Sequence, residues 1–370
     1  MKPFTSRFFF SLISFICFVS SWAAAEPKDL PIGVMFHLTG DFAAWGKAYL
    51  EGVELAQEEI NASGGVNGRK LKLVVEDIRF DPRATASASK KLLDIDRVPI
   101  SLISTFTEVQ VAGPMFERAK VPLVVVGDSD EELDRMGDYI FSTGSWVKGY
   151  AVSASRFMRE GLQLKRVATL TTNNPWSKTT SSIFSSDFKA LGGEVVDGGD
   201  VNPQETDFRS ILLKIRGQKV DGLYAPITAN SVPFFKAARE VGLTIPIVTA
   251  GGALDNDVVA SEPRLVEGRY VANAYLNPNR AEAARLLTNY RTKFGQDPLY
   301  PSVMSRGYDG FMTVADALKK SSDFSSEQIK NALYRVDFEG AGFHVKMSSD
   351  GGARLPVVVL QVKDGILAVR

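Results

Sequence analysis

Residues 32–60 read IGVMFHLTGDFAAWGKAYLEGVELAQEEI, and this stretch decides the fold. It opens with an apolar run, residues 32–36, of the kind found in buried strands. Apolar residues then recur at steps of three and four from Tyr49 to Ile60, which predicts a helix over 42–60. A strand followed by a helix is the unit of a parallel sheet, because parallel neighbours need a crossover connection.

The same unit recurs along the chain, and the repetition predicts an α/β protein with two lobes. Strands are expected at residues 70–76, 100–104, 123–126, 167–170, 195–196, 222–224, 247–248 and 271–274, and helices at 83–93, 177–191, 208–215 and 232–241. Two late helices, 308–319 and 327–334, precede closing strands at 357–361 and 366–369. One set of units ends near residue 145 and a second follows, so each set can form one open, doubly wound sheet.

The first 25 residues have the features of a secretory signal peptide. Lys2 and Arg7 precede an apolar run at 8–22, and three alanines ending at Ala25 supply a cleavage motif. The run of about 15 residues is shorter than the roughly 20 that a spanning helix needs. We therefore expect cleavage near Ala25 and a periplasmic protein. Cys17 follows a bulky residue where a lipoprotein signal has a small one, so no lipid anchor is expected.

The composition argues against nucleic-acid binding and against catalysis. Basic and acidic residues are balanced at 43 each, and no basic stripe is present. Beyond Cys17 there is no thiol, and the two histidines, His37 and His344, are too far apart in sequence to indicate a zinc site. Residues 40–47 resemble a phosphate loop, but their glycine spacing is wrong. We expect no catalytic residue, no metal and no cofactor. His37 ends the first strand, so it could line a pocket rim, although a packed structural histidine is favoured.

Beyond residue 25 the chain resembles the type I periplasmic solute-binding proteins of the leucine/isoleucine/valine-binding family. Segments that carry the resemblance, in order, are 32–46, 51–68, 77–92, 206–221, 235–243 and 308–309. The resemblance implies two doubly wound parallel-sheet lobes joined by a three-segment hinge. It assigns residues 27–145 plus 276–345 to the N-lobe and 146–275 plus 346–370 to the C-lobe. It also implies a monomer that captures a small solute by hinge closure and delivers it to an inner-membrane ABC permease complex.

Aromatic walls of a ligand pocket are implied by the resemblance at two tryptophans. Trp45 matches an N-lobe aromatic residue, and Trp176 matches the C-lobe aromatic residue that closes over the ligand. Thr228 and Asn230 follow a further C-lobe strand, where ligand contacts are also expected. Trp45 could instead be a lobe-surface tryptophan that packs on the first helix.

A carboxylate-binding stretch is implied in the N-lobe. Thr105, Phe106 and Thr107 stand where the family presents hydroxyl and amide groups to a ligand carboxylate. Asp128 and Ser129 follow the next strand, where the family places another hydroxyl for the same carboxylate. These hydroxyl groups could instead cap helices.

One departure from the family concerns the ligand's ammonium group. The resemblance places Gly252 where the amino-acid binders of the family carry a glutamate that pairs with the ligand's ammonium group. Asp128 or Asp255 could replace that glutamate, although Asp255 is expected to cap the next helix. Arg306 could bind an anion through two hydrogen bonds, or it could be a solvated surface arginine. We therefore favour a small organic acid, aromatic or aliphatic, as the solute over an amide or a branched-chain amino acid.

Two other functions are compatible with this sequence. The same fold could serve as a ligand-sensing receptor that feeds a regulator, and genes for a permease and an ATPase nearby would argue against that. A secreted α/β hydrolase is the second, but the chain lacks the Gly-x-Ser-x-Gly motif of that class.

Overall fold

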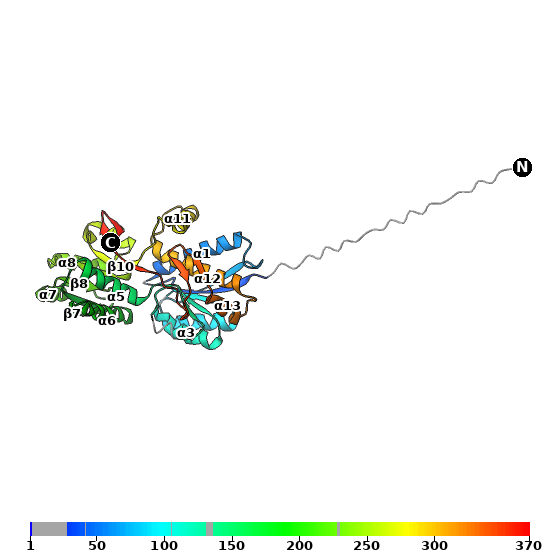
Figure 1. The fold of residues 1–370 in the computed structure, drawn as a ribbon, viewed down its shortest axis with the longest axis horizontal. Helices are drawn as coiled ribbons and strands as arrows, with labels where there is room; N and C mark the ends of the chain where they lie inside the picture. The colour runs from blue at the N-terminus through cyan, green and yellow to red at the C-terminus, as the bar shows by residue number, and fades with distance from the viewer. Residues whose placement is uncertain (2–27, 41, 105, 131–135, 228–229) are drawn as a thin grey trace.

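The computed structural model describes residues 1, 28–40, 42–104, 106–130, 136–227 and 230–370. The predicted signal peptide, Thr105, Thr228 and the side chain of Phe106 lie outside the described part of the chain. Two lobes lie side by side along the long axis of the molecule (Figure 1). In the described ranges, no helix has the length and apolar character needed to cross a membrane.

The first lobe is built on a five-stranded parallel sheet in the order β2-β1-β3-β4-β5. Its strands are β1 (Leu30–Phe36), β2 (Leu71–Asp77), β3 (Ser101–Ile103), β4 (Leu123–Val125) and β5 (Ile140–Ser142). The helices that connect them are α1 (Ala43–Ala62), α2 (Pro82–Lys90) with a π-helical turn η1 (Lys91–Ile95), and α3 (Phe106–Ala119). Later segments that complete this lobe are α11 (Ala281–Phe294), α12 (Pro301–Lys320), α13 (Ser326–Leu333) and the strand pair β11 (Asp337–Glu339) and β12 (His344–Lys346).

The second lobe is built on a seven-stranded sheet in the order β14-β13-β10-β9-β8-β6-β7. Five strands are parallel: β6 (Arg166–Thr172), β7 (Glu194–Val201), β8 (Gly222–Ala225), β9 (Ile247–Ala250) and β10 (Tyr270–Ala274). The edge strands β13 (Val357–Lys363) and β14 (Ile366–Val369) run antiparallel to their neighbours. Its helices are α5 (Val147–Arg156) with η2 (Phe157–Gly161), α6 (Pro175–Ala190), α7 (Arg209–Gly217), α8 (Ser231–Glu240), η3 (Gly251–Leu254), α9 (Asn256–Ser261) and α10 (Pro263–Val266).

The predicted fold class is confirmed, with two local differences. The two closing strands extend the second sheet as an antiparallel hairpin, so that sheet is mixed at one edge. Elements that were not among the predicted ones are the helices α3, α5, α9, α10 and α11 and the strands β5, β11 and β12. In α3 the reason is local, because Gly113 and Pro114 in its interior are residues that disfavour helices.

Two glycines let α1 and α12 pack closely enough to build the site. A Cβ atom on Gly52 would lie 2.0 Å from the carbonyl oxygen of Met304, and one on Gly307 would lie 2.0 Å from that of Tyr49. Backbone therefore packs on backbone at this crossing. As a result Tyr49 of α1 and Arg306 of α12 lie within hydrogen-bonding range of each other, 3.4 Å between Arg306 Nη1 and the tyrosine oxygen.

The segments that connect the lobes run beside one another. Isolated β-bridges join Ser129 to Trp146, Ser142 to Gly352 and Ser145 to Leu355. Two hydrogen bonds of 2.9 Å, Ser129 N to Ser145 O and Val147 N to Ser129 O, tie the loop after β4 to the start of α5.

Candidate functional site

The site lies between the two sheets, where the carboxyl ends of their parallel strands face each other. In the first sheet the strand order reverses between β1 and β3, and in the second it reverses between β6 and β8. Such switch points are where open α/β sheets bind ligands. A cavity of about 800 Å³ opens between them. Among the residues expected from the sequence, those that line it are Trp45, Thr107, Asp128, Trp176, Asn230, Gly252 and Arg306.

Ser129 does not belong to this lining. Its side chain is fully buried, and its backbone pairs with Ser145 and Trp146 between the lobes. The hydroxyl expected to contact a carboxylate is therefore part of the connecting segments, because the chain turns away from the cavity directly after Asp128. The expected contacts at Thr105, Phe106 and Thr228 lie outside the described side chains.

Trp45 packs across the cleft on the backbone of the second lobe. A Cβ atom on Gly252 would lie 2.0 Å from Cζ2 of Trp45 and 3.1 Å from Oδ2 of Asp255. The absence of a side chain at Gly252 thus leaves room for the indole ring. A carboxylate therefore stands directly beside the backbone position where the family's glutamate was expected.

Asp255 corrects one sequence-based expectation. It occupies the N-cap position of α9, but its side chain makes no capping hydrogen bond to that helix. It accepts a hydrogen bond from Asn273 Nδ2 at 3.1 Å and lines the cavity. Burial, with a smaller contribution from Asp257, raises the pKa of Asp255 to about 7.

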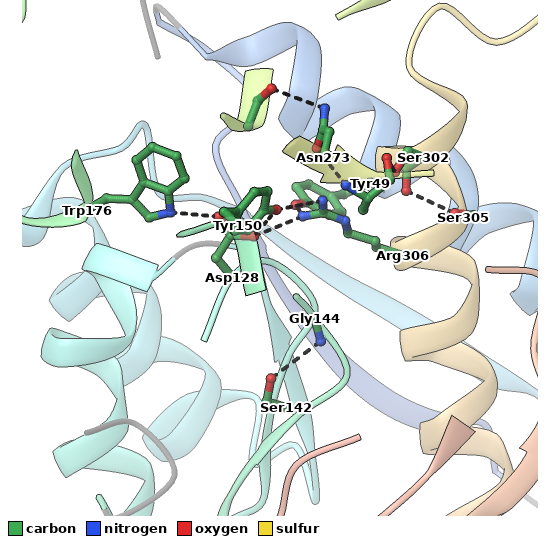
Figure 2. A network of polar contacts seen from close by, with 12 residues as sticks. Tyr49, Asp128, Ser142, Gly144, Tyr150, Trp176, Asn273, Ser302, Ser305 and Arg306 are labelled. Atoms are coloured by element: carbon green, nitrogen blue, oxygen red, sulfur yellow. Dashed lines mark hydrogen bonds and ion pairs between the residues drawn. The ribbon is translucent and has the colours of Figure 1, made fainter. Parts of the chain in front are cut away.

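Arg306 and Asp128, both of the first lobe, form an ion pair that faces the second lobe (Figure 2). Nη1 of Arg306 donates to Asp128 Oδ1 at 3.2 Å, and Nη2 donates to the Tyr150 hydroxyl at 3.1 Å. The Tyr150 hydroxyl in turn donates to Asp128 Oδ1 at 2.8 Å, and Nε1 of Trp176 donates to Oδ2 at 3.0 Å. With Tyr49 as a further partner of the guanidinium, the network joins α1, α12 and the loop after β4 to α5 and α6.

This network changes the expected role of Arg306. Its side chain is only 7% exposed, so the solvated-surface alternative is wrong. Its charge is matched by Asp128, and both terminal nitrogens have partners. Only Nε lacks a hydrogen-bond partner among the described residues. An incoming anion would have to displace Asp128 before it could bind both terminal nitrogens.

Several lining residues were missed by the sequence reasoning or given the wrong weight. His37 directly follows β1, bonds Ser104 Oγ through Nδ1 at 2.9 Å and lines the cavity, and burial lowers its pKa to about 4. Its position after a strand was the available signal. Phe42 and Phe80 pack on each other with ring centroids 4.7 Å apart and also line the cavity. Nothing in the sequence indicated that Tyr150 lines the cavity, because a helical tyrosine that faces a cleft has the same spacing as one that faces a core.

The comparisons with known proteins agree with this architecture. The family model described as periplasmic binding protein matches residues 29–365. Leu/Ile/Val-binding protein homolog 7 of Brucella suis is 24% identical, over 93% of this chain and 92% of the relative.

Two solved structures illustrate the shared fold. The branched-chain amino acid transporter substrate binding protein LivJ of Streptococcus pneumoniae, in complex with isoleucine, is 25% identical with a TM-score of 0.84, covering 92% of this chain and 98% of LivJ. A solute binding protein of an ABC transporter from R. palustris, in complex with 4-hydroxybenzoate, is 18% identical with a TM-score of 0.84, covering 93% and 96%.

The family match covers nearly all of the described chain, and the relatives are solute-binding proteins and not enzymes. Among the described residues, no cluster of His, Cys, Asp and Glu could hold a metal ion. The chain belongs to the periplasmic binding protein family, in its leucine/isoleucine/valine-binding group, and is a solute-binding protein.

Proposed function

We propose that this protein is the periplasmic substrate-binding component of an ABC transporter and that it captures a small organic acid with an aromatic or apolar body. The proposal rests on the two kinds of side chain, aromatic and hydroxyl-bearing, that line one cavity. Aromatic side chains line it from both lobes, and hydroxyl groups at the start of α3 open onto the same space.

The walls favour an apolar, flat body. Phe42, Trp45 and Phe80 come from the first lobe, and Tyr150 and Trp176 come from the second. Burying an aromatic ring of the solute contributes about 25 cal/mol per Å² of apolar area removed from water. With charge-assisted hydrogen bonds of roughly 1.5–3 kcal/mol each, micromolar affinity, about −8 kcal/mol, is within reach.

The carboxylate of the solute is assigned to the start of α3. Ser104 directly follows β3, and Thr107 lies in the first turn of α3. Both residues line the cavity. Backbone N–H groups at a helix N-terminus are unpaired within the helix and favour negative charge. Arg306 can add positive potential nearby, although Asp128 already neutralises most of it.

An amino acid is the second candidate, and Asp255 is the observation that favours it. This carboxylate lies beside Gly252 and accepts a hydrogen bond from Asn273. Arg306 acts on it electrostatically, but among the described residues no cation forms an ion pair with it. An ammonium group of the solute would supply the missing charge. The fold does not distinguish an organic acid from an amino acid as the solute, since LivJ is in complex with isoleucine and the R. palustris protein with 4-hydroxybenzoate.

A thermal-shift screen separates the candidates. Aromatic and aliphatic carboxylates are compared with leucine, valine and amides on the wild type and on Asp255→Asn. We expect organic acids to raise the melting temperature of both proteins. Stabilisation by amino acids alone, lost in Asp255→Asn but kept in the exposed control Asp207→Asn, would show instead that the ammonium site had moved to Asp255.

The location and the lobe boundaries belong to the same proposal. We infer that the chain is exported as a monomer with about 25 residues removed by signal peptidase. Its lobes would then comprise residues 27–145 plus 276–345 and residues 146–275 plus 346–370. The expected result is a periplasmic protein that intact-mass analysis finds to start near Glu26. Retention of Met1, or incorporation of a lipid on Cys17, would contradict it.

A further inference from the structure

His37 and Ser104 form a buried polar pair at the edge of the first sheet. His37 directly follows β1 and Ser104 directly follows β3, and Nδ1 of the imidazole lies 2.9 Å from Oγ of the serine. Both residues are only 1% exposed, and both line the cavity. Because both belong to the first lobe, this contact does not depend on how the two lobes are arranged.

The imidazole ring of His37 is held in place by aromatic rings and by backbone. Its centroid lies 6.5, 6.4 and 6.0 Å from those of Phe42, Tyr49 and Phe80, at interplanar angles of 80° to 88°. On the side of α1, a Cβ atom on Gly46 would lie 3.2 Å from Cδ2 of the imidazole. The ring therefore has little room to turn, and its two nitrogens have fixed and different surroundings.

These surroundings decide which nitrogen carries the proton. Burial lowers the pKa of His37 to about 4, against a smaller opposing effect of Asp77, so the ring is neutral at pH 7 and has one N–H. Nδ1 has the oxygen of Ser104 as an acceptor, whereas Nε2 is buried and has no hydrogen-bond partner among the described residues. A buried N–H group without an acceptor is costly and rare. The proton therefore belongs on Nδ1.

We propose that His37 is a positioning residue, which donates its Nδ1–H to Ser104 and so leaves the Ser104 hydroxyl hydrogen free to donate to the carboxylate of the solute. The inference rests on the proposed function, which assigns the carboxylate to this end of the cavity. A serine hydroxyl has one hydrogen to donate. In the described part of the chain Ser104 Oγ has no hydrogen-bond partner except His37.

The opposite tautomer would reverse the selectivity of this end of the cavity. With the proton on Nε2, the hydroxyl of Ser104 would have to donate to Nδ1 of His37, and only lone pairs of its oxygen would face the solute. A carboxylate has no hydrogen to offer them, whereas the N–H₂ group of an amide has. With the proton on Nδ1, the hydroxyl donates, and a donor binds a charged acceptor more strongly than a neutral one. The pair thereby favours an acid over its amide.

The first test observes the tautomer directly. The chain contains two histidines, so His344→Gln leaves the imidazole of His37 as the only one. Nitrogen-15 and carbon-13 NMR of the ring at pH 7 distinguishes a proton on Nδ1 from a proton on Nε2. We expect the Nδ1–H tautomer in the solute-free protein. The Nε2–H tautomer would overturn the proposal, whichever solute the protein binds.

The second test compares an acid with its neutral counterpart. Titration calorimetry measures the affinities for benzoate and benzamide, which share a ring and differ in charge. His37→Phe keeps a ring and removes the N–H, and we expect it to lower the benzoate-to-benzamide affinity ratio about threefold to tenfold. The matched control is Phe80→Leu, which removes a ring beside His37 and leaves the His37–Ser104 hydrogen bond in place. It should weaken both compounds alike and leave the ratio unchanged.

Ser104→Ala completes a double-mutant cycle, and circular dichroism and melting curves establish that every variant is folded. We expect Ser104→Ala to lower the ratio about tenfold or more, because it removes a charge-assisted donor. Adding His37→Phe to it should then change the ratio no further. An unchanged ratio in His37→Phe, or an equal effect of His37→Phe with and without Ser104, would overturn the inference. A wild type that does not bind benzoate would count against the proposed aromatic acid instead, and the tautomer would still decide the role of His37.

Discussion

Asp255, Asp309 and Glu108 are carboxyl groups whose pKa burial raises to about 7. Since an aspartate in the unfolded chain titrates near 3.8, the folded protein binds more protons than the unfolded chain between about pH 4 and pH 7. The free energy of unfolding therefore falls as the pH rises through this window. Asp309 cannot be substituted cleanly, because it accepts backbone hydrogen bonds from Ala341 and Gly342.

Asp255→Asn tests this assignment in the solute-free protein. We expect the melting temperature of the wild type to fall between pH 5 and pH 8, and that of the variant to fall less, because one of the three groups no longer titrates. At pH 8 the variant should be the more stable protein. Asp207→Asn is the control, since the exposed Asp207 has a pKa of about 2 and titrates below this window. Parallel curves for wild type and Asp255→Asn would contradict the account.

Gly252 is the residue that admits Trp45 to the other lobe. Gly252→Ala places a Cβ atom 2.0 Å from the indole ring, so the lobes cannot close fully unless the ring shifts. We expect solute affinity to fall at least about tenfold, roughly 1.4 kcal/mol, while the melting temperature without solute changes little. Gly217→Ala is the matched control, because nothing lies within 4 Å of a Cβ atom there. Titration calorimetry that finds equal affinities would show that Trp45 does not pack on Gly252 in the bound state.

At the scale of elements, the N-terminal turns of α1 and α6 carry the two tryptophan walls. We expect Trp45→Ala and Trp176→Ala each to weaken solute binding about tenfold or more, because each removes an aromatic wall of the cavity. Phenylalanine variants at these two positions should lose less, since an aromatic ring remains. Both alanine variants should still unfold cooperatively. If either keeps the wild-type affinity, that tryptophan is structural.

The elements show where sequence reasoning succeeds and where it stops. The strand at 32–36 and the helix after it were predicted because their periodicity is local. The pairing of Arg306 with Asp128 was not predicted. Those residues are 178 positions apart, and the close α1–α12 crossing that brings the arginine to the cleft depends on backbone contacts at Gly52 and Gly307.

The outline of the candidate site was predicted because it, too, depends on local sequence patterns. Strand ends can be located from local patterns, and seven of the expected residues do line the cavity. Ser129 and Asp255 were misjudged, because the direction in which a loop turns after its strand depends on the connecting segments and on contacts with the other lobe. No pattern within one lobe contains that information.

For the whole molecule, the arrangement is a cavity of about 800 Å³ that is closed by bonds between two lobes. Because water can replace these bonds when the lobes open, each contributes only about 0.5–1.5 kcal/mol. These bonds leave the cavity between the lobes for the solute to fill. The solute completes closure by burying the aromatic walls, and it thereby shifts an open–closed equilibrium that exists without it.

Small-angle X-ray scattering of the mature protein, with and without the organic acid that gives the largest thermal shift, tests solute capture by lobe closure most directly. We predict a smaller radius of gyration at saturation than in the solute-free protein. Identical profiles with and without a solute that calorimetry shows to be bound would contradict closure as the mode of capture.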